Sequence, residues 1–305
     1  MPPGSRVNMM KRYIYIIGIM VTAATLLLSS CLKQDATWVP VTVAFEPMIG
    51  HDTRAVESIP FPKENSFKVW AVTDSSSEIF IDGEEICYNG NGWLSSKTWP
   101  FDALNFEAYW PTDLPMEFVP GTGLQLKDFD CSEGDVDILI ARASGDMEND
   151  GVTTLRFDHI LSRIDFRMLH SLPEGMSVRL KNVTMVGFAN KGDYNTKIQD
   201  SWYTVDKDFT YVAYDAGETD GILIDAGTAK YISNEFYVIP QACTASVQIE
   251  YEIRYGVSNW VPQTETIKAL ETQWEPSKHY TYTLNLRMDK LTHTTGISSW
   301  NNREL

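Results

Sequence analysis

The sequence has few of the residue patterns on which enzymes and metalloproteins depend. Its 305 residues include four cysteines and five histidines, with no Cys-x-x-Cys pair and no His-Glu-x-x-His motif. It also has no Gly-x-Ser-x-Gly elbow, no phosphate-binding glycine loop and no dinucleotide-binding glycine pattern. These absences leave no candidate catalytic residue and no metal ligand set. We therefore expect a protein that is not an enzyme and has no cofactor.

One acidic stretch, residues 146–151, imitates the start of a calcium-binding loop. Such a loop needs a bidentate acidic side chain six positions after Gly151, and the sequence has Phe157 there. The stretch is therefore interpreted as a solvated hairpin turn.

Basic residues are also scarce. The chain has 25 Lys and Arg against 41 Asp and Glu, and its formal net charge is −16. This charge is repelled by phosphate backbones and anionic lipid surfaces, so nucleic acid is not an expected partner. Hydrophobic residues make up 43% of the chain, which is enough for a well-packed core.

The N-terminus is typical of a targeting segment. Lys11 and Arg12 precede an apolar run, residues 13–28, that is short for a membrane span. Small residues then precede a cysteine in a segment from Leu28 to Cys31, which resembles the bacterial lipobox. We expect a signal peptide over residues 1–30 and acylation of Cys31, whose acyl chains would hold the protein in the outer membrane. An uncleaved anchor helix is the alternative.

Three cysteines remain beyond the signal, namely Cys87, Cys131 and Cys243. A Cys87–Cys131 disulfide is compatible with an oxidising compartment, but no spacing demands it. We expect these side chains to be small buried hydrophobes.

Beyond the signal, apolar residues recur with a period of two. Residues 39–45 alternate apolar Val39, Val41, Val43 and Phe45 with other residues, and residues 247–255 and 280–288 alternate in the same way. This pattern buries one face of a strand and is typical of antiparallel sheets. Shorter candidate strands are residues 67–72, 78–81, 104–109, 136–142, 152–157, 163–168, 177–187 and 234–239. The sequence therefore predicts an all-β fold of the β-sandwich type.

Turn residues separate these strands. Asp82-Gly83 and Asp150-Gly151 each lie between two apolar runs and predict hairpins. The only helical candidate is residues 264–272, and its pattern is weak.

Aromatic residues are plentiful, with nine tryptophans and fourteen tyrosines. They could form a platform for stacking sugars. Those in or next to candidate strands more often fill a sandwich core, however. This expectation covers Trp70, Trp93, Trp99, Tyr109 and Trp110.

Several stretches together resemble the fimbrillin family of Bacteroidales, the subunits and accessory proteins of type V pili. In the N-terminal half these are FKVWAV (67–72), GWLSSKTWP (92–100), LNFEAYWP (104–111), DILIARA (137–143) and LRFDHILSRIDFRM (155–168). In the C-terminal half they are FYVIPQ (236–241) and HYTYTLNL (279–286). Each phrase is weak alone, but the ordered set covers essentially the whole chain beyond the signal.

The resemblance implies two tandem transthyretin-like β-sandwich domains, which we place at residues 31–158 and 159–305. It also implies a structural or adhesive pilus subunit on the cell surface. In the family, an arginine-specific protease removes the first strand of polymerising subunits, and a strand from another subunit replaces it. The matching bond here is Arg54–Ala55.

The residues around this bond support such a step. Residues 39–45 form a strand with one apolar face, and Pro47, Gly50 and Asp52 favour an exposed loop after it. Cleavage after Arg54 would release Cys31 together with this strand. It would leave an apolar groove that a strand of another pilus subunit could fill.

Three alternatives stay open. The polar tail after Met288 slightly favours a tip or minor subunit over a stalk subunit, because it offers few apolar side chains to a partner. A chain that is never cleaved would be a pilus anchor. A surface lipoprotein that binds a host or glycan ligand through exposed aromatic residues is a separate interpretation.

Overall fold

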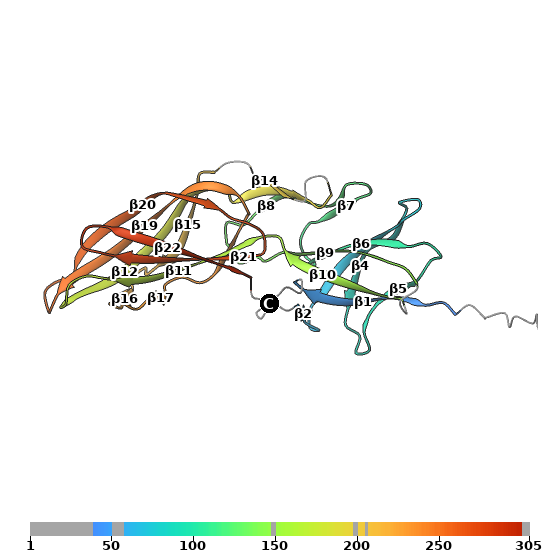
Figure 1. Ribbon diagram of the computed structural model, residues 1–305, viewed down its shortest axis with the longest axis horizontal. Coiled ribbons are helices and arrows are strands. Elements are labelled where there is room, and N and C mark those ends of the chain that lie inside the picture. Colours follow the sequence, from blue (N-terminus) through green and yellow to red (C-terminus); the bar gives the residue numbers. More distant parts are fainter. Residues whose placement is uncertain (1–38, 51–57, 148–150, 198–200, 205–206, 301–305) are drawn as a thin grey trace, which may run out of the picture. The chain divides into compact units, whose positions relative to one another are not determined.

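The computed structural model describes residues 39–50, 58–147, 151–197, 201–204 and 207–300 (Figure 1). Every regular element in these ranges is a β-strand, and none of the described residues is helical. The predicted all-β fold class is therefore confirmed. Within the same ranges, no helix is long and apolar enough to cross a membrane. Val41–Leu305 forms one compact unit.

Sheet I contains eight strands and curls around its own core. In spatial order it comprises β2 (Ile59–Pro60), β1 (Thr42–Ile49), β10 (Val152–His159), β9 (Leu139–Gly145), β6 (Leu104–Trp110), β3 (Ser66–Thr73) and β4 (Ile79–Cys87), with β5 (Trp93–Thr98) paired to β1. A bridge between Tyr88 and Trp93 brings β4 and β5 together. The inward-facing apolar side chains of these strands form one cluster, which includes Phe67, Phe106 and Phe157.

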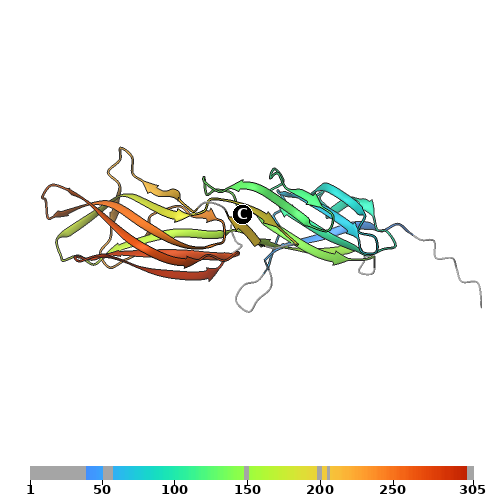
Figure 2. The same cartoon turned by 90° about the horizontal axis from the view of Figure 1, so that it is seen from above.

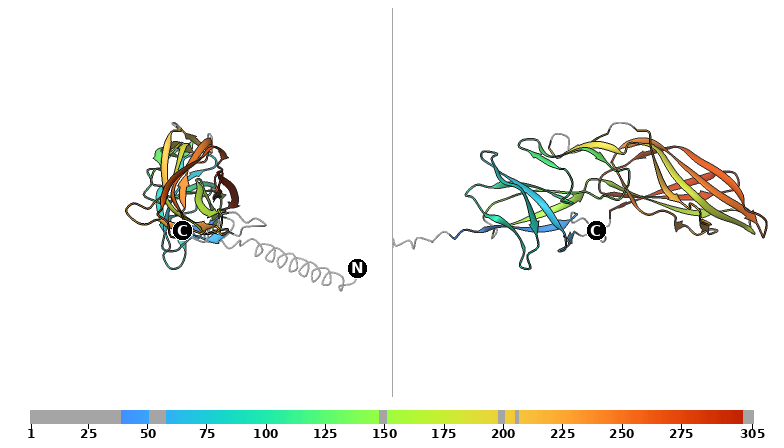
Figure 3. Two further views of the ribbon diagram at one scale, coloured as in Figure 1. Left: turned by 90° about the vertical axis from the view of Figure 1, so that its left-hand side faces the viewer. Right: turned by 180° about the vertical axis from the view of Figure 1, so that it is seen from behind.

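Sheet II is small and packs on the outer face of sheet I (Figure 3). Its strands are β14 (Ser201–Thr204), β13 (Lys191–Asn195), β8 (Gly123–Asp130) and β7 (Glu117–Val119). Leu124 and Tyr194 of this sheet share a cluster with Tyr109 and Ile140 of sheet I. Sheet II combines strands from both sides of residue 158. The domain boundary that we expect at this residue stays a prediction.

Sheets III and IV face each other in a β-sandwich (Figure 2). Sheet III has the order β17 (Lys230–Tyr231), β11 (Ser162–His170), β21 (Lys278–Leu286) and β22 (Leu291–Ser299), with β18 (Phe236–Val238) paired to β11. Sheet IV has the order β15 (Phe209–Asp215), β12 (Met176–Phe188), β19 (Ala242–Tyr255) and β20 (Val261–Gln273), with β16 (Ile222–Ile224) paired to β12. The core is the apolar face of both sheets, as the alternation of buried residues in β19 and β21 shows.

The expectation of purely antiparallel sheets is wrong at two places. β1 pairs with β10 in parallel, and β11 pairs with β21 in parallel. Periodicity shows only that one face of a strand is buried, and it holds no information about the direction of the neighbouring strand.

The weak helical prediction for residues 264–272 is also wrong. This segment belongs to β20, which pairs with β19 from Val261 to Gln273 and buries Ile267 and Leu270. Pairing along a neighbouring strand outweighs the modest helix propensity of a segment such as Lys-Ala-Leu-Glu.

Of the two predicted hairpins, the one at Asp150-Gly151 connects β9 and β10, which are antiparallel neighbours. Asp150 lies outside the described residues, so the turn itself stays a prediction. The hairpin at Asp82-Gly83 is wrong, because both residues lie inside β4. Gly83 has a φ of 64°, and a Cβ there would lie 2.7 Å from the Trp70 ring. The glycine lies at a β-bulge, and its missing side chain leaves space for the Trp70 ring.

The aromatic side chains near the strands do fill cores, with Trp70, Trp93, Trp99 and Tyr109 all buried. The expectation that the three cysteines are buried is confirmed only in part. Cys131 is buried, Cys243 is half-buried and Cys87 is exposed, and all three are free thiols, so the Cys87–Cys131 disulfide does not form.

Candidate functional site: the first strand and its groove

Strand β1 alternates buried and exposed side chains along its whole length. Val43, Phe45 and Ile49 are at most 4% exposed, and Pro47 is also buried, whereas Thr42 and Glu46 face outward. The apolar face of β1 is thus part of the core of sheet I.

The limits of this strand differ from the predicted ones. Val39 is 71% exposed and precedes the strand, and Val41 is only partly buried against the core. At the other end the strand continues through Pro47 to Ile49. Proline lacks an N–H but keeps its carbonyl, and the Pro47 oxygen accepts a hydrogen bond from the Phe61 N–H at 3.0 Å.

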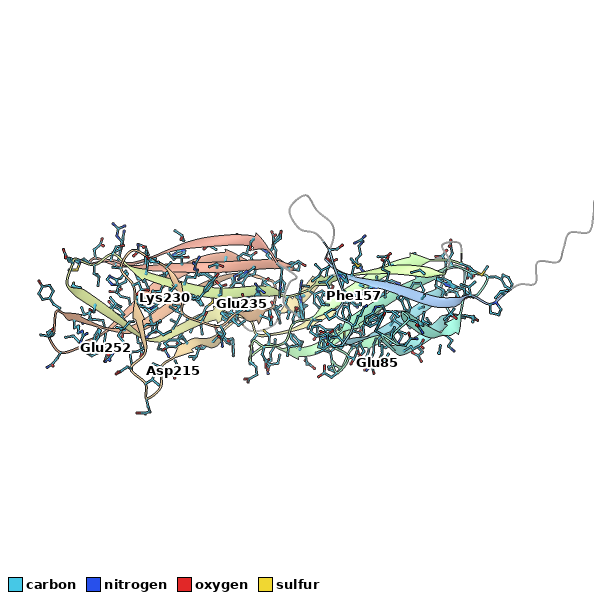
Figure 4. All side chains as sticks on the ribbon, turned by 90° about the horizontal axis from the view of Figure 1, so that it is seen from below. Glu85, Phe157, Asp215, Lys230, Glu235 and Glu252 are labelled. Atoms are coloured by element: carbon cyan, nitrogen blue, oxygen red, sulfur yellow. The ribbon has the colours of Figure 1, made fainter. Side chains whose placement is uncertain are left out.

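β1 has neighbours on both sides. It runs parallel to β10, with Ala44 opposite Val152 and Ile49 opposite Phe157, which Figure 4 labels beside the blue ribbon of β1. On its other side it pairs with β5 near Phe45 and with β2 near Ile49. Withdrawal of β1 would therefore leave unpaired backbone on two flanks.

Backbone hydrogen bonds fasten both ends of β1. Near the start, the Ala44 N–H donates to the Gly151 oxygen at 3.0 Å, and the Val41 oxygen accepts from the Trp99 N–H at 2.8 Å. Just after the strand, the Gly50 N–H donates to the Phe157 oxygen at 2.7 Å.

Phe45 is the central apolar contact of the strand. Its ring lies edge-on to Phe106 at 5.5 Å and to Phe67 at 5.9 Å between ring centroids. Such edge-to-face pairs add about 0.5–1.5 kcal/mol beyond the area that they bury. The loss of this one side chain would open the centre of the core.

Gly151, which the sequence indicated only as a turn residue, lies directly against the start of β1. A Cβ at this position would lie 2.5 Å from Val41 Cγ1 and 2.6 Å from Trp99 Nε1. The Gly151 oxygen also accepts a hydrogen bond from Trp99 Nε1 at 2.9 Å. Only glycine lets the turn approach β1 this closely, and its place in an Asp-Gly pair was the sole sequence signal.

Three predicted site residues, Cys31, Arg54 and Ala55, lie outside the described residues. In the sequence the Arg54–Ala55 bond falls between β1 and β2, and these two strands pair where Ile49 lies opposite Ile59. Lipidation and cleavage stay predictions.

The last strand, β22, is held much more loosely. It pairs along its length with β21 and is the terminal strand of sheet III. Most of its residues are exposed, and Ile297, which lies opposite the buried Tyr280, is 63% exposed.

Trp300 anchors the chain just beyond β22. It is 3% exposed, and its ring stacks on His159 at 3.9 Å and on Tyr237 at 5.2 Å. The Arg163 guanidinium lies 5.5 Å from the centroid of the same ring. The backbone N–H of Trp300 donates to the backbone oxygen of Ser277 at 3.1 Å. One side chain thus supplies most of the burial in this terminal segment.

The structure brings together one group that sequence reasoning missed, formed by Asp165, Glu235 and His279. Their ligand atoms all lie within 4.8 Å of one another. His279 Nε2 is 2.7 Å from Asp165 Oδ2, while Arg163 Nη2 is 3.4 Å from His279 Nδ1 and 3.0 Å from Glu235. A metal on Nε2 would put the imidazole proton on Nδ1, facing the Arg163 cation. The group therefore fits an ion-pair network better than a metal centre.

The thiols of Cys131 and Cys243 are poor nucleophiles. Burial raises the pKa of Cys131 to about 11, and burial likewise raises that of Cys243 to about 11. Both therefore stay protonated at neutral pH, and a thiol reacts as its thiolate.

A family model described as fimbrillin-like matches residues 53–300, which is most of the chain. The chain belongs to the fimbrillin-like family. No curated protein matches it. The family resemblance expected from the phrases around Phe157 and Tyr237 is confirmed.

Solved structures share the fold. A fimbrial protein from Bacteroides vulgatus ATCC 8482 matches with a TM-score of 0.63 and 15% identity, over 86% of this chain and 100% of that one. A proposed cell adhesion protein from Bacteroides ovatus ATCC 8483 matches with a TM-score of 0.56 and 13% identity, over 88% and 100%. One from Parabacteroides distasonis ATCC 8503, also a proposed cell adhesion protein, has a TM-score of 0.56 and 10% identity, over 87% and 99%.

Proposed function

We propose that this fimbrillin-like protein is a structural or adhesive subunit of a cell-surface pilus, exported as a lipoprotein and assembled by strand complementation. The family and the fimbrial neighbours support a non-enzymatic pilus or adhesion subunit at the cell surface. The observation that carries the assembly step is β1, an apolar strand enclosed on both sides and joined to β2 through the segment that contains Arg54.

Cleavage of the Arg54–Ala55 bond by an arginine-specific protease would turn β1 into a separate peptide. Its departure would uncover the apolar side chains that Phe45 now covers, together with the backbone edges of β10 and β5. A strand from another pilus subunit, running parallel to β10, would restore both. Before cleavage, acylated Cys31 would anchor the chain in the outer membrane.

The other end of the chain bears on the place that we propose for the subunit in the fibre. β22 pairs with β21 of its own chain, and Trp300 is buried there. This arrangement supports a tip or minor subunit over a stalk subunit, because the tail is occupied. If the tail is nevertheless a donor, deletion of residues 289–305 abolishes polymerisation. If it is not, polymerisation is unchanged.

An intact-mass measurement on protein released from the cell surface tests the proposal. A mature N-terminus at Ala55 supports the strand-exchange subunit, and Arg54→Ala should abolish this product whereas Lys33→Ala should not. A mature chain that begins at acylated Cys31 contradicts strand exchange by this chain. It would instead identify the protein as an uncleaved pilus anchor.

A further inference from the structure

A cleft of about 550 Å³ opens where the ends of β9 and β10 meet sheet II and the turn after β20. All its lining residues lie within the compact unit Val41–Leu305. Its volume is in the range of pockets that enclose a small molecule. None of the residues of the β1 groove lines it.

The walls of the cleft are mainly apolar and aromatic. The lining includes four buried side chains, Ile140, Ile160, Tyr194 and Trp274, and the partly buried Trp202. The indole N–H of Trp202 already donates to the Ile160 oxygen at 2.8 Å, and its ring is tilted against Tyr194 and Phe129 at 5.2 and 5.5 Å between ring centroids. The part of the ring that stays accessible is what this residue offers to the cleft. An aromatic ring of this kind accepts the C–H face of a sugar.

Planar polar groups lie around these walls. Gln273 and Glu275 both line the cleft with exposed side chains. Arg142 lines it as well, with its Nη1 fixed by a hydrogen bond to the Thr196 oxygen at 2.7 Å. An amide, a carboxylate and a guanidinium can each bond two neighbouring hydroxyl groups at once.

The charges of the lining residues narrow the ligand class. Asp158 and Glu275 are acidic, and Arg142 is the one Lys or Arg among the described lining residues. The cleft therefore has a net negative charge, which disfavours sialylated, sulfated or uronic sugars.

We propose that this cleft binds a short neutral oligosaccharide, which stacks on Trp202 and hydrogen-bonds to Gln273, Glu275 and Arg142. This inference rests on the proposed function, because it names the class of ligand that the surface subunit would bind. Sugar binding in the cleft does not require cleavage at Arg54. The sugar-binding proposal and the pilus proposal can therefore be contradicted independently of each other.

The test applies the full-length protein, extracted in detergent, to an array of neutral and anionic oligosaccharides. The best neutral oligosaccharide is then titrated by calorimetry. We expect neutral sugars to bind, and Glu275→Ala and Gln273→Ala each to weaken the affinity by about tenfold. Both side chains are exposed, so these variants should fold.

Glu250→Ala is the matched control, because Glu250 is an exposed acid on β19 that does not line the cleft. The Glu250→Ala variant should bind the oligosaccharide with the same affinity as the unchanged protein. The proposal is overturned if no neutral oligosaccharide binds, if only anionic ones bind, or if both cleft variants bind as tightly as the control. The mature N-terminus, measured separately, reports on the pilus proposal alone.

Discussion

Among the described residues, the first and last strands, β1 and β22, are built in opposite ways. β1 is an inner strand with a buried apolar face, and β22 is a terminal strand with most side chains in solvent. β1 depends on Val43, Phe45 and Ile49 together, whereas the end of the chain depends largely on Trp300. The burial of its apolar face makes the loss of β1 costly. β22 could leave at little cost in burial.

The largest expected effect is the removal of β1. A variant that starts at Ala55 loses the burial of three large apolar side chains, worth about 1.5–3 kcal/mol each. Its melting temperature should fall by roughly 10 °C or more. A synthetic peptide of residues 39–50 should restore the loss in a calorimetric melt, and a scrambled peptide should not. Equal melting temperatures with and without β1 would contradict the large contribution to stability that we assign to this strand.

A smaller effect is expected for Phe45→Ala, because the rest of β1 stays in place. Truncation of a buried phenylalanine costs about 3–5 kcal/mol in the free energy of unfolding. Denaturant titration measures this loss. Glu46→Ala, which alters an exposed neighbour on the same strand, should stay within about 0.5 kcal/mol.

Trp300→Ala should cost less than Phe45→Ala, about 2–3 kcal/mol, because a chain end can relax into the space that the ring leaves. The same denaturant titration should show it. Trp300→Phe keeps a ring against His159 and should recover part of the loss. A cost above that of Phe45→Ala would reverse the order that we assign to the two ends.

Ile297→Ala should have the smallest effect, below about 0.5 kcal/mol, because the side chain is 63% exposed. Val43→Ala is the matched comparison, since both are β-branched residues in strands but Val43 is fully buried. A loss for Ile297→Ala as large as for Val43→Ala would show that β22 is covered in solution, for example by a second molecule.

Much of the fold follows from local pattern. The candidate strands at residues 67–72 and 104–109 and the alternating one at 280–288 are strands in the structure, although β21 ends at Leu286. In β21 the burial follows a period of two, because only one face of the strand is covered. The helix predicted at residues 264–272 and the hairpin predicted at Asp82-Gly83 are both wrong. In both places a neighbouring strand or a tryptophan ring determines the conformation, and neither is adjacent in sequence.

The candidate site was predictable only in part. The sequence indicated Val43 and Phe45 as buried, but it placed the strand too early and missed Ile49. One of the neighbours of β1 is β10, which is more than a hundred residues away in the chain. No local pattern reports such a distant neighbour.

By itself, the sequence determined the all-β class, the negative charge and the apolar face of the first strand, because composition and periodicity act residue by residue. The family followed from the resemblance of its ordered phrases. Only the tertiary structure decided that β1 lies parallel to β10, that Gly151 must be glycine, and that Trp300 stacks on His159. These features are contacts between distant segments, and they exist only once the sheets have formed.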